Sequence, residues 1–163
     1  MQQAANIEQV FREFFTHYVP RRIIELGTGT GEFTNLLRRL REDVDKDFDI
    51  ITIDQHNDIK EILWPMVFIQ MHVFQHLDIV RDLIKRNTLI LCDNGNKIVE
   101  ITRLSGYLFP DCVIMAHDYC ETIEDLGKYW GCCEITWDDV KDLGLEKYQY
   151  ELMKTAGWLS LKK

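Results

Sequence analysis

The sequence predicts an α/β fold: a doubly wound, mainly parallel sheet with helices on both faces. Short apolar runs alternate with helical patterns along the chain, no linker rich in glycine, serine or proline divides it, and no segment repeats. Strands that alternate with helices form crossover units, and such units build parallel sheets. At 163 residues the chain is near the minimal size for this fold, so we expect residues 1–163 to form a single domain.

The first third of the chain predicts two helices and two strands. Residues 4–18 place apolar side chains at helical spacing, and Pro20 ends this helix. Residues 21–26 are typical of a short buried strand, and residues 48–54 of an isoleucine-rich one. Between these strands the chain turns at three glycines into a helix, whose apolar face comprises Phe33, Leu36, Leu37 and Leu40.

The remainder predicts three further strands. Residues 66–70 and 87–94 are two of them, and a helix with one apolar stripe follows each. The stripes comprise Phe74, Leu77, Val80, Leu83 and Ile84 in the first helix, and Ile98, Ile101, Leu104 and Leu108 in the second. Residues 111–118 form the fifth strand. The pattern then weakens, and we expect a helix around residues 121–130 and short strands at 132–137 and 157–161.

Charge and hydropathy exclude several classes of partner. The net charge is -8, from 27 acidic and 19 basic residues, whereas a nucleic-acid or membrane surface needs clustered cations. No apolar run approaches the ~20 residues needed to span a bilayer, and the first twenty residues are amphipathic rather than a signal peptide. We therefore expect a soluble, cytoplasmic protein that binds neither nucleic acid nor membrane.

The five cysteines show no paired CxxC spacing. An odd count in a chain expected to be cytosolic favours free, mostly buried thiols over disulfides or a zinc site. The residues are Cys92, Cys112, Cys120, Cys132 and Cys133.

A glycine loop follows the first predicted strand. Residues 25–33 read ELGTGTGEF, so Gly27, Gly29 and Gly31 lie within five positions. In an open α/β sheet, ligands bind beyond the carboxyl ends of the strands, and glycines allow them to approach the backbone. Dinucleotide-binding loops read G-x-G-x-x-G and hold a pyrophosphate at a helix N-terminus. Here the third glycine position is Glu32, whose carboxylate would repel a phosphate.

The segment ELGTGTGEFT resembles the first motif of class I S-adenosylmethionine-dependent methyltransferases, in which an acid and an apolar residue precede G-x-G-x-G. The resemblance implies a Rossmann-like methyltransferase fold with S-adenosylmethionine as the cofactor. Its glycines, together with Thr28, would approach the amino-acid part and the ribose of this phosphate-free molecule. Glu25 would serve the ammonium group of the cofactor, directly or through the loop.

Residues after the second and third predicted strands are further candidate cofactor contacts. Asp54 ends the second strand, where nucleotide-binding α/β folds place an acid that binds two ribose hydroxyls. Its neighbour Gln55 is assigned to the same site. By position, Gln70 and Met71 should flank the adenine, although the usual acid is missing there.

Acids follow the fourth and fifth predicted strands, in the segments CDN and AHDY. This pattern resembles the macrocin and cephalosporin-cluster types of small-molecule O-methyltransferase, in which such acids hold magnesium. The resemblance implies that Asp93 and Asp118 are metal ligands near the transferred methyl group, and Asp93 is also assigned to the cofactor site. His117 departs from the pattern because these relatives have an acid there. Magnesium prefers oxygen ligands, so a histidine suits a softer divalent metal better.

Three roles stay open for His117: metal ligand, general base, or a structural residue that bonds a backbone group. The ordinary pKa of histidine lies near neutrality, and methyl transfer to a hydroxyl requires removal of a proton and in-line alignment. His117, Asp118 and Asp93 are the predicted catalytic residues, and the same three are the candidate metal ligands.

The sequence therefore predicts a methyltransferase that acts on a small molecule, with a hydroxyl as the expected acceptor. Two alternatives remain: a non-catalytic S-adenosylmethionine-binding regulatory module and a dinucleotide-binding oxidoreductase. The short chain leaves little cover for a substrate, so we also expect that a homodimer completes the site.

Overall fold

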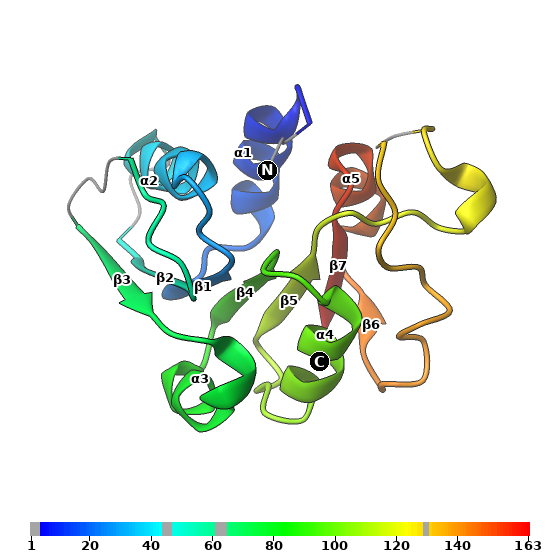
Figure 1. The fold of residues 1–163 in the computed structure, drawn as a ribbon. Coiled ribbons are helices and arrows are strands. Elements are labelled where there is room, and N and C mark those ends of the chain that lie inside the picture. Colours follow the sequence, from blue (N-terminus) through cyan, green and yellow to red (C-terminus); the bar gives the residue numbers. More distant parts are fainter. Residues whose placement is uncertain (1–3, 44–46, 61–64, 129–130) are drawn as a thin grey trace.

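The computed structural model describes residues 4–43, 47–60, 65–128 and 131–163. Its centre is one seven-stranded sheet (Figure 1). The strands are β1 (Arg22–Leu26), β2 (Asp49–Asp54), β3 (Met66–Gln70), β4 (Thr88–Cys92), β5 (Val113–Ala116), β6 (Glu146–Lys147) and β7 (Leu159–Lys162).

The spatial order of the strands is β3-β2-β1-β4-β5-β7-β6. The first five are parallel, and β7 runs antiparallel to both β5 and β6. The chain moves outward from β1 to β3 and then crosses back to β4, so the topological switch point lies between β1 and β4. Ligands of open α/β sheets bind at such a point, beyond the carboxyl ends of the strands. The predicted mainly parallel α/β fold is confirmed.

Helices cover both faces of the sheet, as predicted. Figure 1 shows a group of helices on each face of the sheet. The first group is α1 (Ile7–His17), α2 (Glu32–Asp43) and the short α5 (Tyr150–Met153); the second is α3 (Leu77–Leu83) and α4 (Lys97–Ser105).

Each face of the sheet has its own hydrophobic core. On the first face the aromatic rings of α1 pack against the end of the chain, and the Phe11 ring lies 5.6 Å from that of Trp158 and 5.3 Å from that of Phe33. On the second face, Ile101 and Leu104 of α4 are fully buried with the other sides of the same strands. Burial on both sides explains why the central strands are continuous apolar runs.

The helix predicted around residues 121–130 is wrong. Only a three-residue 3₁₀ turn forms there, at Ile123–Asp125, and residues 129 and 130 lie outside the described part. The chain leaves helical geometry at Leu126, where ψ is 127°, and at Gly127, where φ is +87°. The strand predicted at 132–137 is reduced to one bridge between Tyr119 and Ile135, whereas the strand predicted at 157–161 appears as β7.

The prediction of five free cysteines is also wrong. Cys120 and Cys133 form a disulfide, with their Cα atoms 5.6 Å apart, while Cys92, Cys112 and Cys132 are free. The spacing of the cysteines does not indicate this pairing. The two residues meet only because the loop between them folds back on itself. Among the described residues, no helix has the length and apolar character that crossing a membrane requires.

Gly27 follows β1 and packs against the end of β4. A Cβ atom at this position would lie 2.3 Å from the Asp93 carbonyl oxygen and 2.7 Å from the Asn94 Cα, and the φ angle of Gly27 is +94°. Both the contact and the backbone angle exclude a side chain. The turn from β1 toward α2 therefore requires glycine.

Helix α4 buries two charged residues together with its apolar stripe, Lys97 and Glu100. Glu100 is fully buried, and burial raises the pKa of its carboxyl to about 8 despite the neighbouring Lys97 ammonium. The native state thus holds a proton on Glu100 at neutral pH that the unfolded chain releases.

We expect Gly27→Ala to lower the free energy of unfolding by about 2 kcal/mol or more, because the new Cβ meets backbone atoms and the φ angle is strained. Urea unfolding followed by circular dichroism measures the change. Gly106→Ala is the matched control: Gly106 has a φ of -66° and open space around its Cα, so the substitution should be neutral or slightly stabilising. An unchanged urea midpoint for Gly27→Ala would contradict the packing argument.

We expect the free energy of unfolding to fall between pH 5 and pH 8, and Glu100→Gln to reduce this fall. A carboxyl with a raised native pKa contributes stability below its unfolded pKa and loses it as pH rises through the native value, at up to about 1.4 kcal/mol per pH unit. Urea titrations at several pH values test this. Glu124→Gln, at an exposed carboxylate, is the control and should retain the wild-type slope; an identical slope for Glu100→Gln would contradict the assignment.

Candidate active site at the carboxyl ends of the strands

The candidate site residues stand directly beyond the strand ends, where the ladder of parallel hydrogen bonds continues. Gly27, Asp93 and His117 each follow a strand and donate their amide N–H to the neighbouring strand. The bonds are Gly27 N to Ile53 O and Asp93 N to Leu26 O, both 2.8 Å, and His117 N to Cys92 O, 3.1 Å. The sheet thus fixes the glycine loop, Asp93 and His117 along one edge.

A pocket of about 250 Å³ opens between the glycine loop, the end of β2 and the end of β4. Glu32 and Phe33 at the start of α2 line it together with residues from these three segments. The predicted cofactor residues that line it are Gly27, Thr28, Gly29, Asp54, Gln55 and Asp93. Asn94 of the segment CDN, expected beside Asp93, also lines it, whereas sequence reasoning missed His56 and Asp58, which line it as well.

Asp54 ties the glycine loop to the end of β2. Its Oδ2 accepts a hydrogen bond from the Gly29 amide at 3.0 Å, and its Oδ1 accepts one from the His56 amide at 2.9 Å. A carboxylate has about four lone-pair positions, so each oxygen keeps capacity for one more donor. Asp54 is therefore oriented by the backbone and still able to accept hydroxyl groups in the pocket.

The other predicted cofactor residues do not line the pocket. Glu25 is buried beneath the loop, where its Oε2 accepts a 2.6 Å hydrogen bond from the Thr34 hydroxyl of α2, and burial raises its pKa to about 7. This position leaves Glu25 the indirect role of supporting the loop. Gly31 lies in the turn before α2, with a φ of +84°. Gln70 lies beside the pocket and donates to the Gln55 carbonyl at 3.3 Å, and Met71 follows it.

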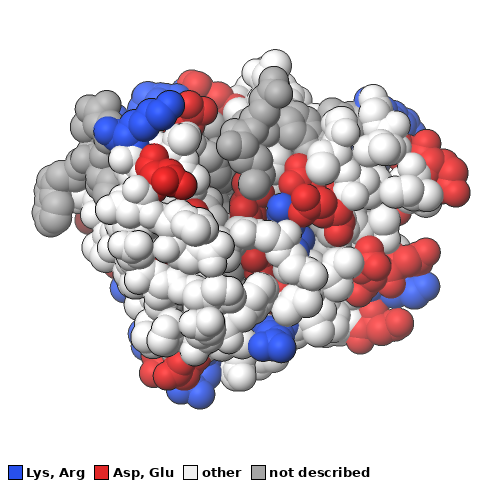
Figure 2. Space-filling view, viewed as in Figure 1, with Lys and Arg blue, Asp and Glu red and all other residues white. Residues whose placement is uncertain are grey.

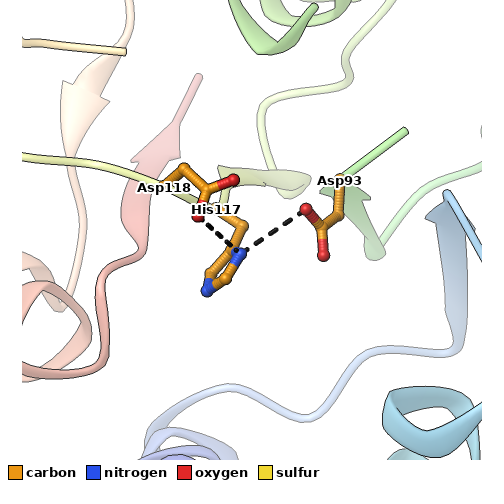
Figure 3. A group of neighbouring side chains, drawn as sticks. All are labelled: Asp93, His117 and Asp118. Carbon is orange, nitrogen blue, oxygen red and sulfur yellow. Dashed lines mark ion pairs between the residues drawn. The ribbon is translucent and has the colours of Figure 1, made fainter. Parts of the chain in front are cut away.

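Asp93, His117 and Asp118 come together, as Figure 3 shows. The His117 Nδ1 lies 3.5 Å from Asp93 Oδ1 and 3.3 Å from Asp118 Oδ1, so the imidazole points between the two carboxylates. One ligand atom from each of the three residues lies within 4.8 Å of the others. Of the three, Asp93 also lines the pocket, and it therefore connects the pocket to the group behind it.

The group is buried and held by its surroundings. His117 has no exposed surface, and its ring centre lies 4.9 Å from that of Trp158. Asp118 has a φ of +58°, in the left-handed region that aspartate tolerates better than most residues. Such a backbone angle next to buried charges is typical of functional sites.

Lys97, which the sequence reasoning missed, lies in the same group. Its Nζ is 2.7 Å from Glu134 Oε2, 3.1 Å from Asp118 Oδ2 and 3.6 Å from Asp93 Oδ1. One signal could have found it: Lys97 precedes Ile101 and Leu104 by four and seven positions, which places a charge on the buried stripe of the helix. Figure 2 shows acidic side chains gathered around the hollow in this face, with basic atoms recessed among them.

The charges in this group shift one another's protonation. Burial tends to lower the pKa of Lys97, but the bond to Glu134 and the charges of Asp93 and Asp118 outweigh it, so its pKa lies above the usual value. Burial also raises the pKa of the Asp93 carboxyl, and the contacts with His117 and Lys97 offset only part of that rise. Asp93 is thus a better proton acceptor than an exposed aspartate.

Known structures share this fold, although no family model and no curated protein matches the sequence. The apo-structure of CmcI superposes with a TM-score of 0.73 and 16% identity, covering 100% of this chain and 72% of CmcI. A structure of CmcI with Mg and S-adenosylmethionine gives 0.69 and 16%, covering 99% and 72%. The methyltransferase MycE, with Mg and S-adenosylhomocysteine, gives 0.57 and 12%, covering 97% and 48%.

An S-adenosylmethionine-dependent methyltransferase from Geobacter sulfurreducens, in complex with S-adenosylhomocysteine, gives 0.56 and 13% identity, covering 89% of this chain and 65% of that one. Identities this low establish a common architecture and leave the chemistry to be argued from the site. The chain has the Rossmann-like fold of the class I methyltransferases.

Proposed function

We propose that this chain is an S-adenosylmethionine-dependent methyltransferase that acts on a hydroxyl group of a small molecule. The observation that carries the proposal is the pocket between the glycine loop, Asp54 and Asp93 at the topological switch point. It combines backbone that a ligand can approach closely with an oriented carboxylate for hydroxyl groups. The structures of CmcI and MycE with this cofactor or its product support the choice of ligand.

The charges around the pocket favour a sulfonium nucleoside over a dinucleotide. Glu32, Asp54 and Asp93 all line the pocket, and none of these carboxylates favours a pyrophosphate. S-adenosylmethionine carries a positive sulfonium and an ammonium and has no phosphate. Asp54 would accept hydrogen bonds from the two ribose hydroxyls, and the loop Gly27–Gly31 would contact the ribose and the amino-acid part.

The proposed reaction is a direct displacement. The acceptor oxygen attacks the methyl carbon in line with the C–S bond, that bond breaks, and the electron pair stays on sulfur to give S-adenosylhomocysteine. The hydroxyl proton passes to Asp93 or, through it, toward the imidazole of His117, whose Nδ1 lies between Asp93 and Asp118. The chain supplies alignment and a proton acceptor, and the cofactor supplies the leaving group.

The same three residues form a donor set that suits a divalent cation. Two carboxylates and one imidazole lie within 4.8 Å of one another, and Asp93, His117 and Asp118 would hold the ion. When bound, such an ion supplies a Lewis acid that lowers the pKa of the acceptor hydroxyl. The Lys97 ammonium, however, already contacts two of these ligands.

A non-catalytic cofactor-binding module is the second candidate. The observation that favours it is the burial of His117 and Asp118, which face Asp93 and Lys97 rather than open solvent. Under this alternative the pocket binds the cofactor, and the group behind it has a structural role.

We expect the wild-type chain to bind S-adenosylhomocysteine and Asp54→Ala to weaken this binding by at least about tenfold, because two charge-assisted hydrogen bonds are lost. Isothermal titration calorimetry measures the affinity, and circular dichroism checks that the variant folds. Asp78→Ala, at an exposed acid of α3, is the matched control and should bind like the wild type. Absence of wild-type binding at millimolar ligand, or tighter binding of NAD, would refute the cofactor assignment.

We expect His117→Gln to lower methyl transfer by about 100-fold or more while cofactor affinity stays within a few-fold, since general acid–base groups contribute about that much. Transfer of radiolabelled methyl from S-adenosylmethionine to a panel of phenols, sugars and hydroxy acids measures the rate. The same panel separates the candidates: cofactor binding without transfer to any compound supports the regulatory module, and full activity of His117→Gln removes His117 from the mechanism.

A further inference from the structure

Lys97 places a buried ammonium at the centre of three carboxylates. It lies at the start of α4, where the Asn96 side chain caps the helix by accepting from the Val99 amide. Only 2% of the Lys97 side chain is exposed, and its Nζ contacts Asp93, Asp118 and Glu134. We call these three acids the carboxylate cluster.

The geometry matches the needs of a buried cation. An ammonium has three N–H donors, and the three carboxylates lie at 2.7, 3.1 and 3.6 Å from it. A buried charge persists only where partners offset its loss of hydration, and here each of the two buried acids faces the ammonium directly. Lys97 and the cluster therefore neutralise one another within the fold.

A divalent ion would need the same oxygen atoms. Asp93 Oδ1 faces both Lys97 Nζ and His117 Nδ1, so an ion bound between Asp93 and His117 would lie next to the ammonium. A second potential ion position, formed by Asp118, Cys132 and Glu134, uses the remaining two contacts of Lys97. Like charges so close in a poorly hydrated region repel strongly.

We propose that the Lys97 ammonium and a divalent cation are alternative occupants of the carboxylate cluster, and that the ammonium holds it in the wild-type chain. Lys97 is thus the resident cation of the carboxylate cluster and keeps the affinity of the cluster for metal low. The proposal rests on the proposed function only in taking these acids as part of the reaction site. Mn²⁺ binding needs neither cofactor nor acceptor, so the two proposals can fail separately.

The test measures Mn²⁺ binding to the full chain without cofactor. Electron paramagnetic resonance quantifies the free ion. We expect Lys97→Met to bind Mn²⁺ at least about tenfold more tightly than the wild type, because the competing positive charge is gone from the carboxylate cluster. Lys97→Arg retains the charge and should bind as weakly as the wild type. Adding Asp93→Asn to Lys97→Met should abolish the gain.

A second variant and a second measurement keep the test informative if Lys97→Met does not fold. Lys97→Gln keeps a polar group at the position, and Mn²⁺ should raise its melting temperature but leave that of the wild type unchanged, since ligands stabilise the state that binds them. Equal Mn²⁺ affinity in the wild type and in folded Lys97→Met and Lys97→Gln would overturn the proposal. So would micromolar binding by the wild type that Asp93→Asn removes, or a gain in Lys97→Met that neither Asp93→Asn nor Cys132→Ser removes.

Discussion

The parallel hydrogen bonds that continue past the ends of β1, β4 and β5 determine where the candidate site residues lie. Asp93 donates to the last residue of β1, and His117 donates to the last residue of β4. The same register brings the Gly27 Cα so close to the Asp93 carbonyl that no side chain fits between them. The glycine loop and Asp93 therefore form one packed unit, and a shift in either would displace the other.

This unit joins two regions of different charge. The pocket side presents carboxylates, which attract a sulfonium, and Asp93 belongs to both regions. Behind it, Lys97 and His117 lie among Asp93, Asp118 and Glu134. A deprotonated acceptor oxygen near Asp93 would be repelled by these acids alone. In the proposed reaction, the Lys97 ammonium would reduce that repulsion and offset the negative charge that develops on the acceptor.

The sequence predicts the parts of the fold that depend on local pattern. The central parallel strands are largely apolar because both faces of the sheet are covered there, and the turn after β1 requires glycine. The segment after Asp118 is different, because contacts between distant residues shape it. The Cys120–Cys133 disulfide and the Cys120 N–H bond to the Ile135 carbonyl fold it back on itself, and no periodicity in the sequence encodes either contact.

The same loop explains why only part of the candidate site could be predicted. Asp93, His117 and Asp118 end strands, and parallel strands bring their carboxyl ends to one edge, so the pattern indicates that they are neighbours. Glu134 has no such signal: it reaches Lys97 because its amide donates to the Asp118 carbonyl at 2.8 Å, beside the disulfide. Lys97 itself lies on the apolar stripe of α4, where burying a charge is costly unless oppositely charged partners contact it. A cation on a buried stripe, four residues after a strand-end acid, is therefore the sequence feature that indicates a built-in counter-ion rather than a surface lysine.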